Sequence, residues 1–128
     1  MAGSSVWPST HRFLDILKSP AVRNRIANEA LQFAIKSNPA PLYLKSFASR
    51  ISVGNFEDDM KKIADCDWII EVVVENLDIK RKVFEQVEQF RKPGTLITSN
   101  TSGIPIHLMT EGRSDDFAKH FCGTHFFN

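Results

Sequence analysis

The sequence predicts an α/β fold, in which helices flank a parallel β-sheet. Two runs, at residues 68–74 and 95–99, are rich in β-branched and aliphatic residues, as is typical of parallel strands buried on both faces. An amphipathic stretch at 77–92 lies between them. Strand–helix–strand alternation with such short connections implies right-handed crossovers and helices packed on the sheet.

Composition excludes several classes of protein. The chain has 128 residues, of which 42% are hydrophobic and 24% charged, as expected for one globular domain. Sixteen basic and fifteen acidic residues leave a net charge of +1, so no overall field attracts nucleic acid or a membrane surface. Two cysteines, Cys66 and Cys122, are too few for a disulfide framework. No apolar run is long enough for a signal peptide or a membrane span, and we expect a cytoplasmic protein without membrane insertion.

The first half of the chain predicts mainly helix. We expect residues 1–18 to be a variable N-terminal segment. Ser19 and Pro20 are suited to the start of a helix, and the prolines of "NPAPLY" end it. The run "ISVGN" at 51–55 predicts a short strand, and "FEDDMKKIA" at 56–64 predicts a short helix. The apolar residues at helical spacing in the first helix are Val22, Ile26, Ala30, Phe33 and Ala34.

The second half predicts the sheet and its crossovers. Pro93 and Gly94 end the helix at 77–92, whose apolar stripe is expected to be Ile79, Val83, Val87 and Phe90. Residues 106–120 are helical or turn-like, and "FCGTHFFN" predicts a last strand near 122–127. We therefore expect strands near 51–53, 68–74, 95–99 and 122–127 in one parallel sheet.

Polar residues follow three of these strands, at the points where the strands end. The clusters are Glu75-Asn76, Ser99–Gly103 and His125–Asn128. In open parallel sheets, ligands bind beyond the carboxyl ends of the strands. The clusters therefore outline a site at one edge of the sheet, with Glu75, Ser102 and His125 near one another.

Each cluster also has a purely structural interpretation. Glu75-Asn76 could cap the following helix, and the side chains of Ser99–Ser102 could bond their own backbone in a turn. A single histidine among aromatic residues, such as His125, is often a core residue with satisfied hydrogen bonds. The residues alone leave these alternatives open.

A metal site is a further possibility, because "HFCGTH" contains His120, Cys122 and His125. On a strand, positions 120 and 122 share one face, whereas 125 points to the other. Zinc requires ligands that converge, so we predict no metal site. The sequence also contains no nucleophile elbow and no phosphate-binding lysine loop.

The second half of the chain resembles a known family. The run "IIEVVVENLDIKRKVFEQVEQFRKPGTLITSNTSGIPI", followed by "HFCGTHFFN", is similar to the NAD-binding domain of the 3-hydroxyacyl-CoA dehydrogenases of fatty-acid β-oxidation. The resemblance extends back to about Ser19 and is carried by "VENL", "SNTSG" and "HFFN". The segments "NPAPLY" and "VGNFEDD" resemble the bacterial long-chain form. The resemblance implies that residues 19–128 are a partial NAD-binding Rossmann domain.

The resemblance also implies an activity and roles for particular residues. The activity is the NAD-dependent oxidation of a 3-hydroxyacyl-CoA to the 3-oxoacyl-CoA, by a full-length protein that forms homo-oligomers. His125 matches the general base, and Ser102 matches the serine that bonds the C3 oxygen of the substrate. Four residues match positions of the cofactor site: Glu75, Lys80, Asn100 and Asn128.

The departures from the family pattern are equally informative. No G-x-G-x-x-G run holds the pyrophosphate, because the six glycines are scattered. The glutamate that orients the catalytic histidine would fall beyond Asn128. We therefore expect a fragment without the first strands, and expect the isolated chain to be inactive and weakly folded. Two alternatives remain: another β-hydroxyacid dehydrogenase, or a non-catalytic binding module derived from the fold.

Overall fold

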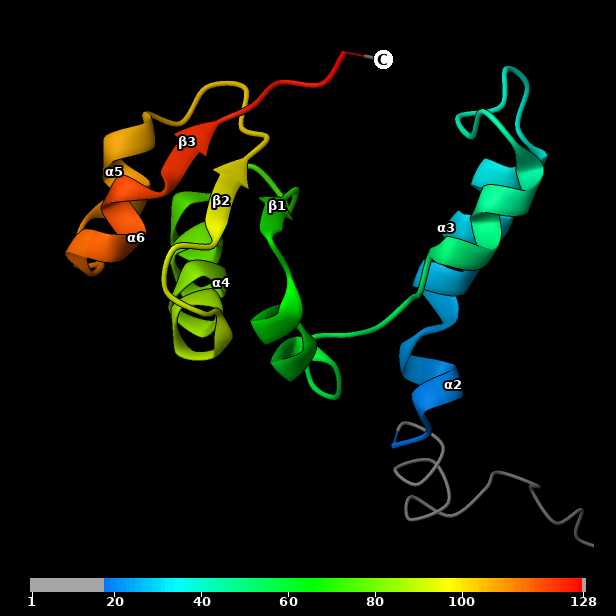
Figure 1. Ribbon diagram of the computed structural model, residues 1–128, viewed down its shortest axis with the longest axis horizontal. Coiled ribbons are helices and arrows are strands. Elements are labelled where there is room, and N and C mark those ends of the chain that lie inside the picture. The colour runs from blue at the N-terminus through cyan, green and yellow to red at the C-terminus, as the bar shows by residue number, and fades with distance from the viewer. Residues whose placement is uncertain (1–17, 128) are drawn as a thin grey trace, which may run out of the picture. The chain divides into compact units, whose positions relative to one another are not determined.

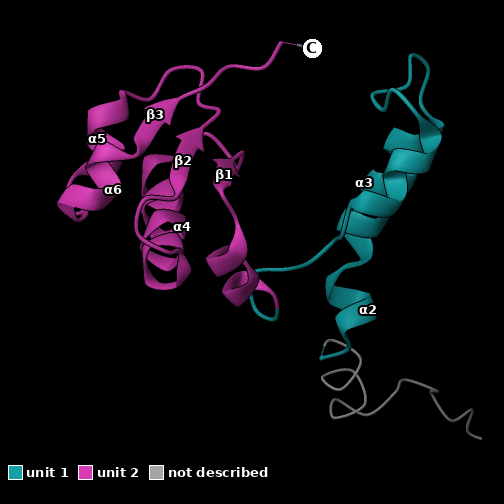
Figure 2. Cartoon of the chain, in the orientation of Figure 1, with its two compact units in different colours: residues 1–58 teal, residues 59–128 magenta. Residues whose placement is uncertain are grey.

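A computed structural model describes residues 18–127 of the chain, in two compact units, residues 1–58 and 59–128 (Figure 2). Asn128 and residues 1–17 of the expected variable segment lie outside the described residues. Within residues 18–127, no helix is long and apolar enough to cross a membrane. Cys66 and Cys122 are both free thiols.

The first unit is helical. It contains α2 (Pro20–Arg23), α3 (Arg25–Lys36) and the 3-10 helix η1 (Lys45–Arg50), and none of the three buries a residue. Although α3 is amphipathic as predicted, Phe33 on its apolar stripe is 76% exposed. Polar contacts join the two ends of this unit. The side chain of Arg23 donates two hydrogen bonds to the carboxylate of Asp58, at 2.7 and 2.8 Å.

The predicted strand at 51–53 is wrong. Ile51 has an extended backbone, with φ −99° and ψ 119°, but residues 51–53 belong to no strand. The amide of Ile51 instead donates to the carbonyl oxygen of Ala48, 3.1 Å away, and closes η1. An apolar run of this length forms a strand only when a neighbouring strand accepts its hydrogen bonds. The predicted helix at 56–64 is also displaced, to the 3-10 helix η2 (Met60–Asp65).

The second unit contains the predicted parallel sheet. Three strands, β1 (Trp68–Glu71), β2 (Leu96–Ser99) and β3 (Phe121–Gly123), lie in the order β1-β2-β3, and both pairs are parallel (Figure 1). Helix α4 (Leu77–Phe90) connects β1 to β2. Two short helices connect β2 to β3. They are α5 (Ile106–Thr110) and α6 (Asp115–Lys119).

Two strands end earlier than predicted. β1 stops at Glu71, whose side-chain Oε1 accepts a hydrogen bond from the amide of Val73 at 2.5 Å. β3 stops at Gly123, although the next amide, of Thr124, still donates to the carbonyl oxygen of Ser99. Glu75 and His125 therefore lie in the loops beyond the ends of β1 and β3, and neither residue belongs to a strand.

One hydrophobic core joins the helices to one face of the sheet. Phe84 packs edge-to-face against Phe117 and Phe121, with ring centroids 5.6 and 5.1 Å apart. Trp68 and Ile70 point to the other face of the sheet, away from this core, and remain 46% and 41% exposed. The fully or nearly buried core residues are Met60, Phe84, Val87, Ile97, Met109 and Phe117.

Candidate functional site

Polar side chains gather where the three parallel strands end. A cavity of about 370 Å³ lies between residues 101–106, from the loop after β2 to the start of α5, and residues 123–125, at the end of β3 and just beyond it. Ser102 and His125 both line this cavity. The prediction that these two residues meet at one end of the sheet is therefore confirmed.

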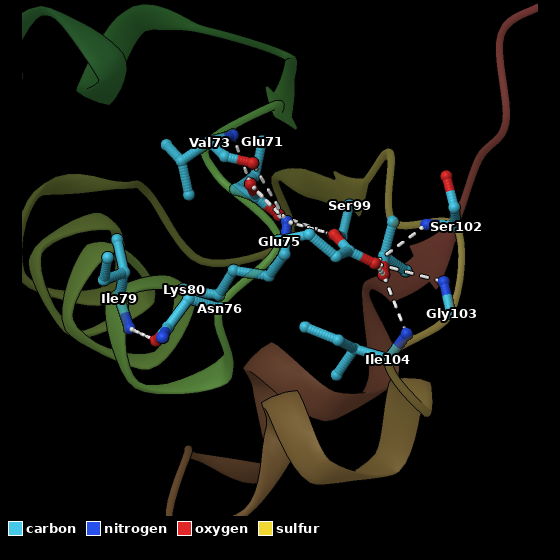
Figure 3. A network of polar contacts seen from close by, with 11 residues as sticks. Glu71, Val73, Glu75, Asn76, Ile79, Lys80, Ser99, Ser102, Gly103 and Ile104 are labelled. Atoms are coloured by element: carbon cyan, nitrogen blue, oxygen red, sulfur yellow. Dashed lines mark hydrogen bonds and ion pairs between the residues drawn. The ribbon is translucent and has the colours of Figure 1, made fainter.

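Glu75 holds the loop that carries Ser102. Its Oε1 accepts hydrogen bonds from the hydroxyl of Thr101 at 2.6 Å and from the backbone amides of Ser102 and Gly103, both at 3.1 Å (Figure 3). The Thr101 hydroxyl, with further help from the two amides and Lys80, lowers the pKa of Glu75 to about 2. Glu75 is consequently ionised at neutral pH, and its position agrees with the prediction that it lies near Ser102.

Asn76, beside Glu75, has a structural role. Its side-chain oxygen accepts from the amide of Ile79 at 3.1 Å and caps α4. The capping interpretation of the Glu75-Asn76 pair is thus correct for Asn76, whereas Glu75 points to the loop after β2.

Lys80 lies in the interior beneath Glu75. It is 1% exposed, and its ammonium is 2.9 and 3.0 Å from the two carboxylate oxygens of Glu71, which is 4% exposed. The same Nζ is 3.4 Å from Oε2 of Glu75, so Lys80 lies between two carboxylates (Figure 3). The hydroxyl of Ser99 also donates to Glu71, at 2.5 Å.

The part played by Glu71 was missed from the sequence. An acidic residue inside a continuous apolar strand is the signal that could have revealed it, because a buried carboxylate requires a partner. The lysine nine positions later, in the first turn of α4, supplies that partner.

Asn100 ties the end of β3 to the loop after β2. Its amide donates to the carbonyl oxygen of Glu71 at 2.9 Å, and its side-chain oxygen accepts from the amide of Phe126 at 2.9 Å. Asn100 therefore fixes the segment next to His125 in place. Asn128, the last predicted cofactor residue, lies outside the described residues.

Ser102 and His125 keep their reactive atoms available. Within residues 18–127, the hydroxyl of Ser102 has no hydrogen-bond partner, and the ring of His125 makes only an edge-to-face contact with Phe127, with centroids 5.0 Å apart. Both residues are exposed at the cavity. A hydroxyl and an imidazole that face one cavity can together bind and deprotonate an alcohol.

Among residues 18–127, no three His, Cys, Asp or Glu side chains lie close enough together to hold a metal ion. Nδ1 of His120 lies 2.7 Å from the carbonyl oxygen of Asp116, at the end of α6.

Comparisons with known proteins find relatives of the chain in sequence and in fold. The family described as "3-hydroxyacyl-CoA dehydrogenase, NAD binding domain" matches residues 15–128. A probable 3-hydroxyacyl-CoA dehydrogenase of Bacillus subtilis is 53% identical over 110 residues, which are 86% of this chain and 14% of the relative. A protein of Deinococcus radiodurans with the same description is 45% identical over 113 residues, 88% of this chain and 33% of the relative.

A solved structure shares the fold. The (S)-3-hydroxybutyryl-CoA dehydrogenase of Ralstonia eutropha superposes with a TM-score of 0.61 and 29% identity, over 86% of this chain and 38% of that one. The chain thus spans a third or less of the two curated relatives described above.

Proposed function

The chain belongs to the family of 3-hydroxyacyl-CoA dehydrogenase NAD-binding domains, and we propose that the protein carrying it oxidises a 3-hydroxyacyl-CoA to the 3-oxoacyl-CoA with NAD. The observation that carries the proposal is the cavity shared by Ser102 and His125, beside the ionised Glu75. Its polar groups match those that oxidation of a secondary alcohol requires.

The two cavity residues divide the work on the substrate. The imidazole of His125 accepts the proton of the 3-hydroxyl, since histidine is the side chain that most often serves as a general base in enzymes. The hydroxyl of Ser102 donates a hydrogen bond to the same C3 oxygen and stabilises the charge that develops there. Because the backbone amide of Ser102 is already bound by Glu75, its side chain is the group left for the substrate.

The cofactor side of the site is assigned to Glu75, Asn100 and Asn128. Lys80, predicted to contact the cofactor, is buried and bound to Glu71, Val73 and Glu75, so it supports Glu75 instead. Glu75 fits the ribose next to the nicotinamide, since its side chain is 45% exposed and its Oε2 contacts only Lys80 among the described residues. An ionised carboxylate there can accept hydrogen bonds from ribose hydroxyls. NAD bound there would supply the acceptor for the hydride of C3. The sequence has no G-x-G-x-x-G run, so these residues account for the nicotinamide end only.

The same proposal covers the setting of the reaction. An acyl-CoA is the substrate, the full-length protein forms a homo-oligomer, and the reaction takes place in the cytoplasm. Relatives described as fatty acid oxidation complex trifunctional enzymes, such as one from Rickettsia felis that is 37% identical over 123 residues, support a role in fatty-acid oxidation.

A chimaeric enzyme tests the proposal. The 110 matched residues of the Bacillus subtilis relative would be replaced by the corresponding residues of this chain, and NADH formation from a 3-hydroxyacyl-CoA measured by absorbance. The unaltered relative serves as the reference. We expect the chimaera to turn over. A folded chimaera that binds NAD and acyl-CoA but forms no NADH would overturn the proposal.

A further inference from the structure

Three charged side chains in mutual contact, Glu71, Lys80 and Glu75, run from the end of β1 to the loop that lines the cavity, and we propose that Glu71 and Lys80 position this loop and with it Ser102. Neither residue lines the cavity. Both act through Glu75, which contacts Lys80 with one oxygen and the loop with the other. The purpose of this positioning rests on the proposed function, but the coupling itself is independent of any substrate.

The buried pair is the fixed end of the line. Glu71 receives two contacts from Lys80, one from the amide of Val73 and one from the hydroxyl of Ser99. Its carboxylate is therefore held by β2, by α4 and by the segment that follows β1. Buried ion pairs add little net stability compared with apolar residues of similar size. A role in orientation explains better why two charges are buried at the end of a strand.

Lys80 links the buried carboxylate of Glu71 to the carboxylate of Glu75. An ammonium has three donor hydrogens, and Nζ of Lys80 has Glu71, the carbonyl oxygen of Val73 at 3.4 Å and Oε2 of Glu75 at 3.4 Å as partners. One cation thus separates two carboxylates. Without it, Glu71 and Glu75 would repel each other, and the more exposed Glu75 would turn towards water.

Glu75 is the movable end, and it contacts the atoms that determine where Ser102 lies. Two consecutive amides, of Ser102 and Gly103, donate to one oxygen of Glu75, and this fixes the direction of the backbone at Ser102. The Thr101 hydroxyl donates to the same oxygen and accepts from the amide of Ile104 at 3.1 Å, which closes the loop. The hydroxyl of Ser102 is therefore aimed by a contact that begins at Glu71.

The test uses the full 128-residue chain, labelled with ¹⁵N and ¹³C and titrated with acid in an NMR spectrometer, without NAD or substrate. In the unaltered chain, the amide signals of Ser102 and Gly103 and the Nζ signal of Lys80 should shift with the midpoint of the Glu75 carboxyl. In Glu75→Gln, this shared transition should be lost. An Nζ signal that does not follow the Glu75 midpoint would overturn the proposal even if no other variant folded.

A double variant tests the fixed end. Glu71→Gln with Lys80→Met removes both buried charges. The single amide oxygen of the glutamine can still accept from the amide of Val73, and its NH2 group can donate to the hydroxyl oxygen of Ser99. We expect the Glu75 midpoint to move to higher pH and the Ser102 and Gly103 amide signals to move at neutral pH, while exchange protection of Phe84 and Ile97 persists. The control, Glu85→Gln, removes one charge from the exposed side of α4 and should leave the loop signals unchanged.

The two proposals fail in different ways. Unchanged loop signals in a folded double variant would overturn the positioning role and leave the proposed dehydrogenase activity untouched. Loss of activity in the chimaera, with the NMR coupling intact, would overturn the proposed function and leave the positioning of the loop standing.

Discussion

Residues 18–58 and 59–127 both contain amphipathic helices, yet only the second set buries any side chain to less than one-tenth exposure. Helix α3 forms with Phe33 76% exposed, whereas α4 packs Phe84, at 0% exposure, against the sheet. The helical pattern is equally clear in both segments. The comparison teaches that periodicity predicts a helix, but that only a neighbouring β-sheet or helix decides whether its apolar stripe becomes a core.

The largest expected contrast is between the two phenylalanines. Phe84→Ala removes a fully buried ring from the centre of the aromatic cluster and should destabilise the second unit by about 3–5 kcal/mol. Phe33→Ala should change the free energy of unfolding by no more than about 0.5 kcal/mol. Urea denaturation followed by circular dichroism measures both. Equal losses would show that α3 is as firmly packed as α4.

A buried ion pair of the second unit should contribute much more to the free energy of unfolding than an exposed ion pair of the first unit. Lys80→Met leaves the buried carboxylate of Glu71 without its cation and should cost about 3 kcal/mol or more. Arg25→Met breaks the exposed pair with Glu29 on α3, 2.9 Å long, and should cost only about 0.3–0.5 kcal/mol. Denaturant midpoints of the two variants compare them directly, and a cost for Arg25→Met as large as that for Lys80→Met would contradict the account.

A smaller effect is expected from helix capping. Asn76→Ala removes the side-chain acceptor at the start of α4 and should destabilise the unit by about 1 kcal/mol. Ser19, at the start of α2, makes no side-chain capping bond, so Ser19→Ala serves as the control and should have little effect. A thermal melt distinguishes the two, and a control that loses as much stability as Asn76→Ala would refute the assignment.

The smallest expected effect concerns how the stability of the second unit depends on pH. The pKa of Glu75 is lowered to about 2, so its bonds to the loop stabilise the fold above the ordinary value of 4.5 and are lost as pH falls from there through 2. Thr101→Val removes the largest cause and should raise the pKa of Glu75. The ¹³C signal of the carboxyl carbon follows this titration, and an unchanged midpoint would show that the Thr101 hydroxyl has no such effect.

Much of the second unit could be predicted from sequence. The strands that contain Ile69 and Ile97, the helix between them and the meeting of Ser102 with His125 all follow from local patterns and from the rule for parallel sheets. The identity of the residues on the buried face of α4 did not follow from these patterns. Ile79 was expected in the apolar stripe of α4 and is 43% exposed, whereas Phe84 was not expected there and is fully buried.

The remaining errors depend on partners distant in the sequence. Ile51 is apolar and extended, but a strand also needs a neighbour, and that neighbour is not visible in a local pattern. The role of Glu71 depends on Lys80 and Ser99, which belong to other elements. Tertiary contacts of this kind decide which polar residues are buried, and periodicity carries no information about them.

The central claim is that His125 acts as the base in the cavity it shares with Ser102, and kinetics of the chimaeric enzyme test it most directly. His125→Ala should lower kcat by about 10²- to 10⁴-fold while the Kd for NAD changes little, because the imidazole acts in the chemical step. The matched control is His107→Ala, on the exposed side of α5, which should leave kcat unchanged. A His125→Ala enzyme with a kcat within a few-fold of the His107→Ala enzyme would contradict the account.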